Sequence, residues 1–187
     1  MKTLLCAAAL CAAALSANAA DTLPAGTLIT GTLSGASTSL LGLDHEFAAE
    51  PGSNITALSG TELEYISADF ALAIDLISDG GLLIYGNTDN GALPGNYVLS
   101  FSFAALPSAL ISFALVDTSH VLSGSVSAQL LSGNSIQITL NNVVLDSPFS
   151  TIGAQAVSAV PEPASWALIA AGLGIFALRS QRRGAQS

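Results

Sequence analysis

Apolar and polar side chains alternate one by one through much of the region between residues 27 and 145. Because successive side chains of a β-strand point to opposite faces of a sheet, this period of two predicts half-buried strands and not helices. The clearest alternating segments are residues 70–77, 97–103, 111–115, 125–129 and 136–140. In two of them, we expect Phe70 and Ile111 on the buried face together with the apolar residues that follow at every second position.

Glycine, asparagine and proline separate the alternating segments, as is typical of turns. Residues 79–81, 89–91 and 93–95 carry such turn signals, and residues 131–135 fit a hairpin turn. No amphipathic helix pattern is visible in this region. The pattern therefore predicts an all-β domain over residues 20–153, an antiparallel β-sandwich or jelly-roll-like ectodomain of about 8–10 strands. We interpret residues 154–159 as a short linker.

The charges of the chain are separated along the sequence. All four basic residues lie near the two ends, whereas twelve of the thirteen acidic residues lie in residues 21–160, which gives that segment a formal charge of −12. A segment without Lys or Arg cannot neutralise phosphates, so the sequence argues against a nucleic-acid partner. It is not attracted to an anionic membrane surface either. Net charge of this size favours solubility outside the cell.

The N-terminal residues have the three parts of a secretory signal peptide. Lys2 supplies the positive start, residues 4–15 form an uncharged Leu/Ala run, and Ala17 and Ala19 have the spacing of a signal peptidase site. We expect residues 1–19 to form a signal helix that engages the Sec translocon, with cleavage after Ala19 or, as the second choice, Ala20. Both cysteines lie in this segment, so the mature chain has no disulfide or thiolate chemistry.

The C-terminal residues suggest a marginal membrane span. Residues 164–178 carry no charge, and at 1.5 Å per residue they form a helix of about 22 Å, against a hydrocarbon core of ~30 Å. Trp166 suits the outer interface, and Arg179, Arg182 and Arg183, in a basic cytoplasmic tail over residues 179–187, set the orientation. We therefore expect one short transmembrane helix.

Immediately before this span, Pro161 and Pro163 flank Glu162 and hold the backbone extended. The order Pro-Glu-Pro, apolar run and basic cluster resembles the PEP-CTERM sorting domain of Gram-negative bacteria, a tail that is also labelled an ice-binding protein C-terminal domain. This resemblance assigns residues 160–187 as a sorting signal. It implies that exosortase, a membrane cysteine peptidase or transpeptidase, recognises Pro161, Glu162 and Pro163.

The resemblance also implies where the chain goes. An exosortase substrate waits in the inner membrane as a precursor, in transient contact with the bilayer, and then reaches the outer surface or the extracellular matrix. Because exosortase is often encoded with exopolysaccharide genes, the resemblance points to biofilm and to extracellular polysaccharide as a candidate partner. It implies nothing about what the β-rich domain itself binds.

Within the β-rich domain, few residues suggest chemistry. Asp44, His45 and Glu46 form an acid–His cluster, which we interpret as an exposed loop, and His120 reads as part of a polar turn. Residues 87–91 crowd oxygen-bearing side chains around a glycine but lack the order of a calcium-binding loop. The sequence therefore predicts no catalytic residue, no metal site and no cofactor.

Two functions remain as hypotheses from the sequence. The first is a non-enzymatic surface or matrix protein that is sorted and processed by exosortase. The alternative is a secreted hydrolase or a calcium-dependent carbohydrate-binding module with the same tail. Since Trp166 lies in the tail, the aromatic candidates for sugar stacking in the domain are Tyr65, Tyr85 and Tyr97.

Overall fold

The computed structural model describes residues 21–159, and Asp21–Ala159 forms a compact unit. The expected signal helix and transmembrane helix lie outside these residues. Among residues 21–159, no helix is long and apolar enough to cross a membrane. The helical structure described there is one short 3-10 turn, η1 (Leu43–His45).

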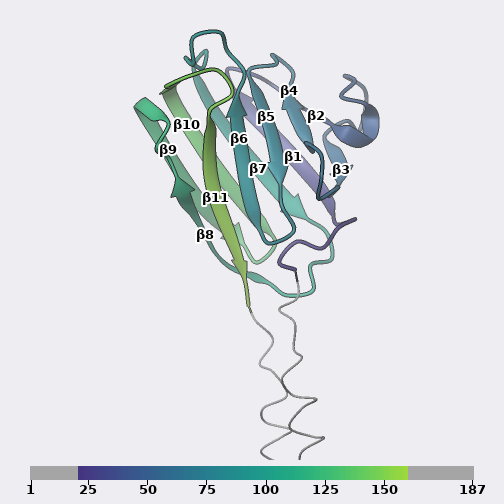
Figure 1. The fold of residues 1–187 in the computed structure, drawn as a ribbon. Helices are drawn as coiled ribbons and strands as arrows, with labels where there is room; N and C mark the ends of the chain where they lie inside the picture. Colours follow the sequence, from purple (N-terminus) through teal and green to yellow (C-terminus); the bar gives the residue numbers. More distant parts are fainter. Residues whose placement is uncertain (1–20, 160–187) are drawn as a thin grey trace, which may run out of the picture. The chain divides into compact units, whose positions relative to one another are not determined.

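Eleven strands in the described segment form two sheets, in which every pairing is antiparallel (Figure 1). The five-stranded sheet has the order β3 (Ile55–Ala57), β1 (Leu28–Gly35), β7 (Asn96–Phe103), β10 (Ser135–Leu145) and β9 (Val121–Ser132). The six-stranded sheet has the order β2 (Leu40–Gly42), β4 (Tyr65–Ser67), β5 (Leu72–Leu76), β6 (Gly81–Gly86), β11 (Thr151–Ser158) and β8 (Leu110–Asp117). The prediction of an antiparallel β-sandwich is confirmed, with eleven strands rather than 8–10.

The core lies between the two sheets and is made of the residues that alternate along the strands. In β7, Tyr97, Leu99, Phe101 and Phe103 are buried, and they belong to one apolar cluster with the alternate residues of β5 in the other sheet. The ring of Tyr65 in β4 contacts that of Phe101, with 5.8 Å between centroids. Each such side chain contributes about 1.5–3 kcal/mol on burial, so this alternation is what holds the sheets together.

Two residues expected on buried faces are exposed, so those predictions are wrong. Phe70 lies in the β4–β5 turn with a φ of 60°, and its side chain is 60% exposed. Ile111 lies at a β-bulge in β8, where the pairing with β11 passes from Ser112 to Leu110 and omits it. Because a bulge inserts one extra residue, it changes the face on which the following side chains lie.

The linker expected at residues 154–159 is also wrong for most of its length. Strand β11 runs to Ser158 and lies inside the six-stranded sheet, hydrogen-bonded to β6 on one side and to β8 on the other. Ala154 and Ala156 point into the core and are fully buried. The described unit therefore extends through Ala159, six residues beyond the expected boundary.

Candidate functional site

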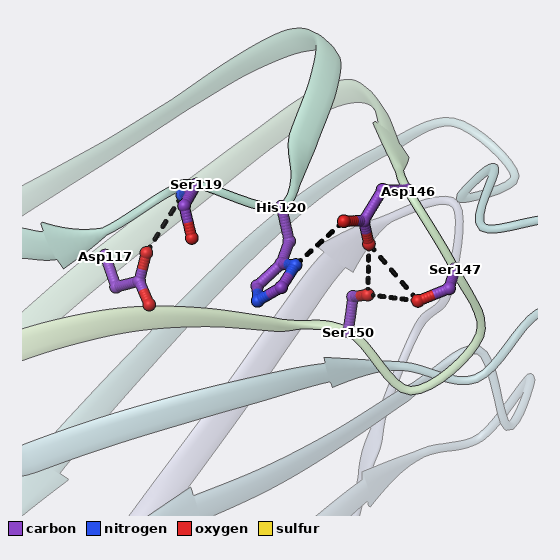
Figure 2. Close-up of polar contacts among 6 residues, drawn as sticks. All are labelled: Asp117, Ser119, His120, Asp146, Ser147 and Ser150. Carbon is purple, nitrogen blue, oxygen red and sulfur yellow. Dashed lines mark hydrogen bonds and ion pairs between the residues drawn. The ribbon is translucent and has the colours of Figure 1, made fainter.

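The main cluster of interacting polar side chains around a histidine lies where the β8–β9 turn meets the β10–β11 loop (Figure 2). Asp117 ends β8, the turn supplies Ser119 and His120, and the loop supplies Asp146, Ser147 and Ser150. A backbone bond of 3.0 Å from the Asp146 N–H to the His120 carbonyl joins the two segments. The imidazole Nδ1 of His120 lies 2.9 Å from Oδ2 of Asp146, although the two residues are 26 positions apart.

The second carboxylate oxygen of Asp146 accepts hydrogen bonds from two serine hydroxyls, Ser150 at 2.5 Å and Ser147 at 3.2 Å. The hydrogen bond from Ser150, followed by the hydrogen bond with His120, lowers the pKa of Asp146 to about 2. In return, the hydrogen bond and the charge of Asp146 raise the pKa of His120. The side chains of His120 and Asp146 are exposed, so their ion pair is screened by solvent and contributes little to stability.

This cluster has the residue types of a Ser-His-Asp triad but not its connections. In a triad, the imidazole lies between the carboxylate and the serine, because it must take the proton of the attacking hydroxyl. Here Asp146 lies between His120 and the serines, and both hydroxyls bond to the carboxylate (Figure 2). The imidazole of His120 therefore makes no hydrogen bond to the hydroxyl of Ser147 or Ser150, and neither hydroxyl has a histidine base to take its proton. The cluster instead joins the β8–β9 turn to the β10–β11 loop.

Asp44, His45 and Glu46 do not converge on one site. Asp44 turns its carboxylate to the Ala57 N–H at 2.8 Å, and His45 pairs through Nδ1 with Glu50 at 2.5 Å. Both contacts are exposed and fasten the η1 segment to β3 and to its own loop. Within residues 21–159, no group of three or more His, Cys, Asp or Glu side chains is placed to hold a metal ion.

Residues 87–91 use their polar groups to form a turn. The side-chain amide of Asn87 donates to the Phe70 carbonyl at 2.8 Å, and the Asn90 side-chain oxygen accepts the Ala92 N–H at 3.0 Å. Gly91 has a φ of 73° and lies so close to the Leu145 carbonyl that a Cβ would be 2.2 Å away from it. The glycine is therefore required by a close approach of two backbones.

Two of the three tyrosines considered for sugar stacking are core residues, so that interpretation is wrong for them. Tyr65 and Tyr97 have 0% exposure. The Tyr97 hydroxyl donates to Asp69 at 2.7 Å, and burial raises the pKa of both phenols. Tyr85 is half-buried on the outer face of β6, between Ala73 and Thr151 of the adjacent strands. Burial, followed by the charge of Asp75, raises its pKa.

Sequence reasoning missed Glu64, a carboxylate with 0% exposure directly before β4. It accepts hydrogen bonds from the Leu76 N–H at 2.7 Å and from the N–H and hydroxyl of Ser59 at 3.0 and 3.1 Å. Burial raises its pKa in spite of these bonds. Glu64 thereby ties the loop before β4 to β5. Its partners are five and twelve positions away, so no pattern in the sequence marks it.

The residues expected to carry sorting, Pro161, Glu162 and Pro163, lie outside the described residues. The same holds for the expected orientation residues Trp166, Arg179, Arg182 and Arg183, and for the expected signal peptidase site at Ala17 and Ala19. Their assignment therefore depends on comparison with known proteins.

A family model described as the PEP-CTERM protein-sorting motif matches residues 159–183. The match begins directly after β11, which ends at Ser158. No curated protein and no solved structure matches the chain. The motif implies processing by exosortase, a membrane protein, and therefore export by way of a membrane-anchored precursor. The chain is thus a PEP-CTERM domain-containing protein, sorted through residues 159–183.

Proposed function

We propose that this chain is a non-enzymatic protein of the cell surface or extracellular matrix, which exosortase processes near Pro161, Glu162 and Pro163. The observation that carries the proposal is the position of the sorting motif. It starts at residue 159, one residue after the last strand of a sandwich that contains its own core. Processing at the motif leaves that sandwich intact outside the cytoplasm and removes the basic tail.

The polar cluster supports a role without catalysis. The hydroxyls of Ser147 and Ser150 are held by the carboxylate of Asp146, which cannot act as a strong base because its pKa is lowered to about 2. A hydrolase would need a base with a pKa near the working pH in contact with its nucleophile. This arrangement favours the non-enzymatic proposal over the hydrolase alternative.

Extracellular polysaccharide is the partner that we propose, and Tyr85 is the residue through which we expect contact. Aromatic rings with a polar tip suit partly hydrated interfaces. Its ring lies on an outer face beside Asp75, whose carboxylate can accept hydroxyl donors. Replacement of Tyr85 by Ala should reduce retention of the processed chain on matrix polysaccharide, measured by co-sedimentation. The matched control is Leu83→Ala on the same face of β6, which should leave retention unchanged.

The sorting part of the proposal is tested by a variant in which Pro161, Glu162 and Pro163 are all replaced by alanine. Wild type and variant are blotted from membrane and exported fractions of cells with and without exosortase. We expect a shorter, exported form only for wild type in cells with the enzyme, because the variant lacks the extended anionic peptide. The three other samples should retain the longer form in the membrane.

A matched control replaces a Glu-Pro pair outside the motif, the exposed Glu50 and Pro51, with Glu50→Ala and Pro51→Ala. This variant should be processed like wild type, because it lies outside the motif. If all samples show the same size and location, the sorting proposal is wrong. If matrix polysaccharide is degraded by the purified processed chain, the non-enzymatic part is wrong and the hydrolase alternative is correct.

A further inference from the structure

Strands β8 and β9 form the open side of the sandwich. β8 is the last strand of the six-stranded sheet, β9 is the last strand of the five-stranded sheet, and a turn at residues 118–120 connects them. Figure 1 shows both on the same side of the domain, opposite β2 and β3. β9 is twelve residues long and contains no charged residue and no proline. Soluble proteins commonly protect such edges with Lys, charges or Pro, so this edge lacks the usual protection.

The two edge strands also turn aliphatic side chains toward solvent. The pairing of β8 with β11 omits Ile111 and Val116, and the pairing of β9 with β10 omits Leu122 and Leu131. These four bulged residues are 61%, 65%, 68% and 46% exposed. A bulge re-aims a side chain and twists the strand locally, and the bulges of β9 lie toward its two ends, leaving Ser125–Leu130 in regular register. Here each of the four directs an aliphatic side chain outward.

The inner face of β9 is incompletely covered. Val126, Ala128 and Leu130 pack against the core but are only partly buried, because no strand lies beyond β9 in the described sheet. A further strand on that edge would complete their burial. It would also pair the backbone N–H and C=O groups that the edge leaves free.

The acidic residues are concentrated away from this side. Ten of the twelve lie between Asp21, before β1, and Asp89, after β6, and only Asp117 and Asp146, next to the β8–β9 turn, follow. The strand order places β2, β4 and β5 far from β8, and β3 at the edge opposite β9. Two copies approaching at the β9 edge therefore keep most of their like charges well beyond a Debye length of ~8 Å.

We propose that the β9 edge pairs antiparallel with the β9 edge of a second copy of this chain, which makes one sheet continuous across a twofold dimer. In such a twofold pair, one residue at the centre of β9 must lie opposite the same residue of the second copy. The middle of β9 is at Val126 and Ser127. Pairing centred on Ser127 places Leu122 of one copy opposite Ser132 of the other, one position from Leu131, so both bulged leucines lie within the paired region. An uncharged strand on a strongly acidic domain fits a second uncharged strand better than it fits a basic partner.

The test is the mass of the processed chain by sedimentation equilibrium over a range of concentrations. Wild type should show a reversible monomer–dimer equilibrium. The double variant Leu122→Glu and Leu131→Glu should weaken dimerisation by about 100-fold or more, because four aliphatic side chains leave the interface and four like charges enter it. The matched control Leu28→Glu with Ile55→Glu adds the same charge at exposed aliphatic residues of β1 and β3, and should dimerise like wild type.

A second readout does not depend on weakening the dimer. The processed chain has no cysteine once residues 1–19 are removed. Opposed residues of antiparallel strands have Cα atoms about 4.5–5.5 Å apart, which suits a disulfide. Exposed Ser127→Cys should therefore form a disulfide-linked dimer in air, whereas exposed Ser34→Cys in β1 should not. A monomeric wild type, equal dimerisation of both glutamate variants, or equal cross-linking of both cysteine variants overturns the proposal.

Discussion

The Tyr65 hydroxyl joins the two sheets by a hydrogen bond. It extends from β4 and donates to the Ile29 carbonyl of β1 at 2.6 Å, with the Asn54 carbonyl at 3.2 Å. A buried carbonyl that loses its donor pays the desolvation penalty without compensation. Because of its position, Tyr65 has a structural role in addition to its apolar contact with Phe101.

We therefore predict that Tyr65→Phe lowers the free energy of unfolding by about 1–3 kcal/mol. Tyr85→Phe is the matched control, because its hydroxyl lies on the outer face, and it should change stability by less than about 0.5 kcal/mol. Urea unfolding of the processed chains measures both. Equal stability of Tyr65→Phe and wild type would show that the bond between the sheets contributes nothing.

The His120–Asp146 pair predicts a pH dependence in two directions. The folded-state pKa of His120 is raised above its ordinary value of 6.5. Its contribution to the free energy of unfolding is therefore complete below pH 6.5 and is lost as pH rises through the raised pKa. That of Asp146 is lowered from 3.8 to about 2, so its contribution is present above pH 3.8 and is lost as pH falls toward 2.

The stabilising effect of the pair is therefore largest between about pH 4 and 6.5. His120→Gln should lower the thermal midpoint at pH 5 and have a smaller effect at pH 9, compared with wild type by calorimetry at each pH. Because both groups are exposed, the difference should be small. A larger effect at pH 9 than at pH 5 would contradict the assignment.

At the scale of the elements, β11 shows what the sequence does not reveal. Its residues are Thr-Ile-Gly-Ala-Gln-Ala-Val-Ser, and Gly and Ala are depleted in strands, which is why residues 154–159 read as a linker. The small side chains instead let a central strand fit a tightly packed core, where Ala154 and Ala156 are fully buried. Burial, not intrinsic propensity, decides the structure of this segment.

This account predicts a sharp difference between neighbouring residues of β11. Ala156→Asp places an unpaired charge in the core and should destabilise the domain by about 3 kcal/mol or more. Val157→Asp, on the exposed face of the same strand, should be nearly neutral. The measurement is urea unfolding of both variants. If both are tolerated equally, residues 154–159 behave as the linker that the composition suggested.

The alternation of apolar residues predicted the strands that carry the core, including β5, β7 and β10, because buried faces impose a period of two. It could not place Ile111, since the bulge in β8 depends on pairing with β11 about 45 residues later. It also could not bring His120 to Asp146, because they meet only when the β8–β9 turn and the β10–β11 loop are folded. The sorting motif was recognisable because its order is local.

At the scale of the whole molecule, charge is distributed unevenly across the sandwich. Residues 21–160 have a formal charge of −12 without a compensating basic residue, whereas the edge strand β9 carries no charge and the β8–β9 side has only Asp117 and Asp146, at its turn. Such a domain repels its own copies in most orientations. The uncharged edge of β9 is the part of the described domain at which two copies can approach with the least repulsion.

We accordingly predict that self-association becomes tighter as salt is raised. The dissociation constant of the processed chain should fall several-fold between about 0.02 and 0.3 M NaCl, because salt screens repulsion between the acidic halves. Sedimentation at each salt concentration measures it. Weaker association at high salt would mean that attraction between opposite charges holds the copies together, which contradicts the uncharged interface.

The central claim is that an acidic β-sandwich is exported and separated from its basic tail by exosortase. Its most direct test is the intact mass of the exported chain from cells with and without that enzyme. We predict that the enzyme-containing cells yield a chain that begins at Ala20 or Asp21 and lacks Arg179, Arg182 and Arg183, with Ser158 and the rest of β11 retained. Without exosortase, the chain should keep the arginines and stay in the membrane. An exported chain that carries Arg179, Arg182 and Arg183 in cells with exosortase would contradict the account.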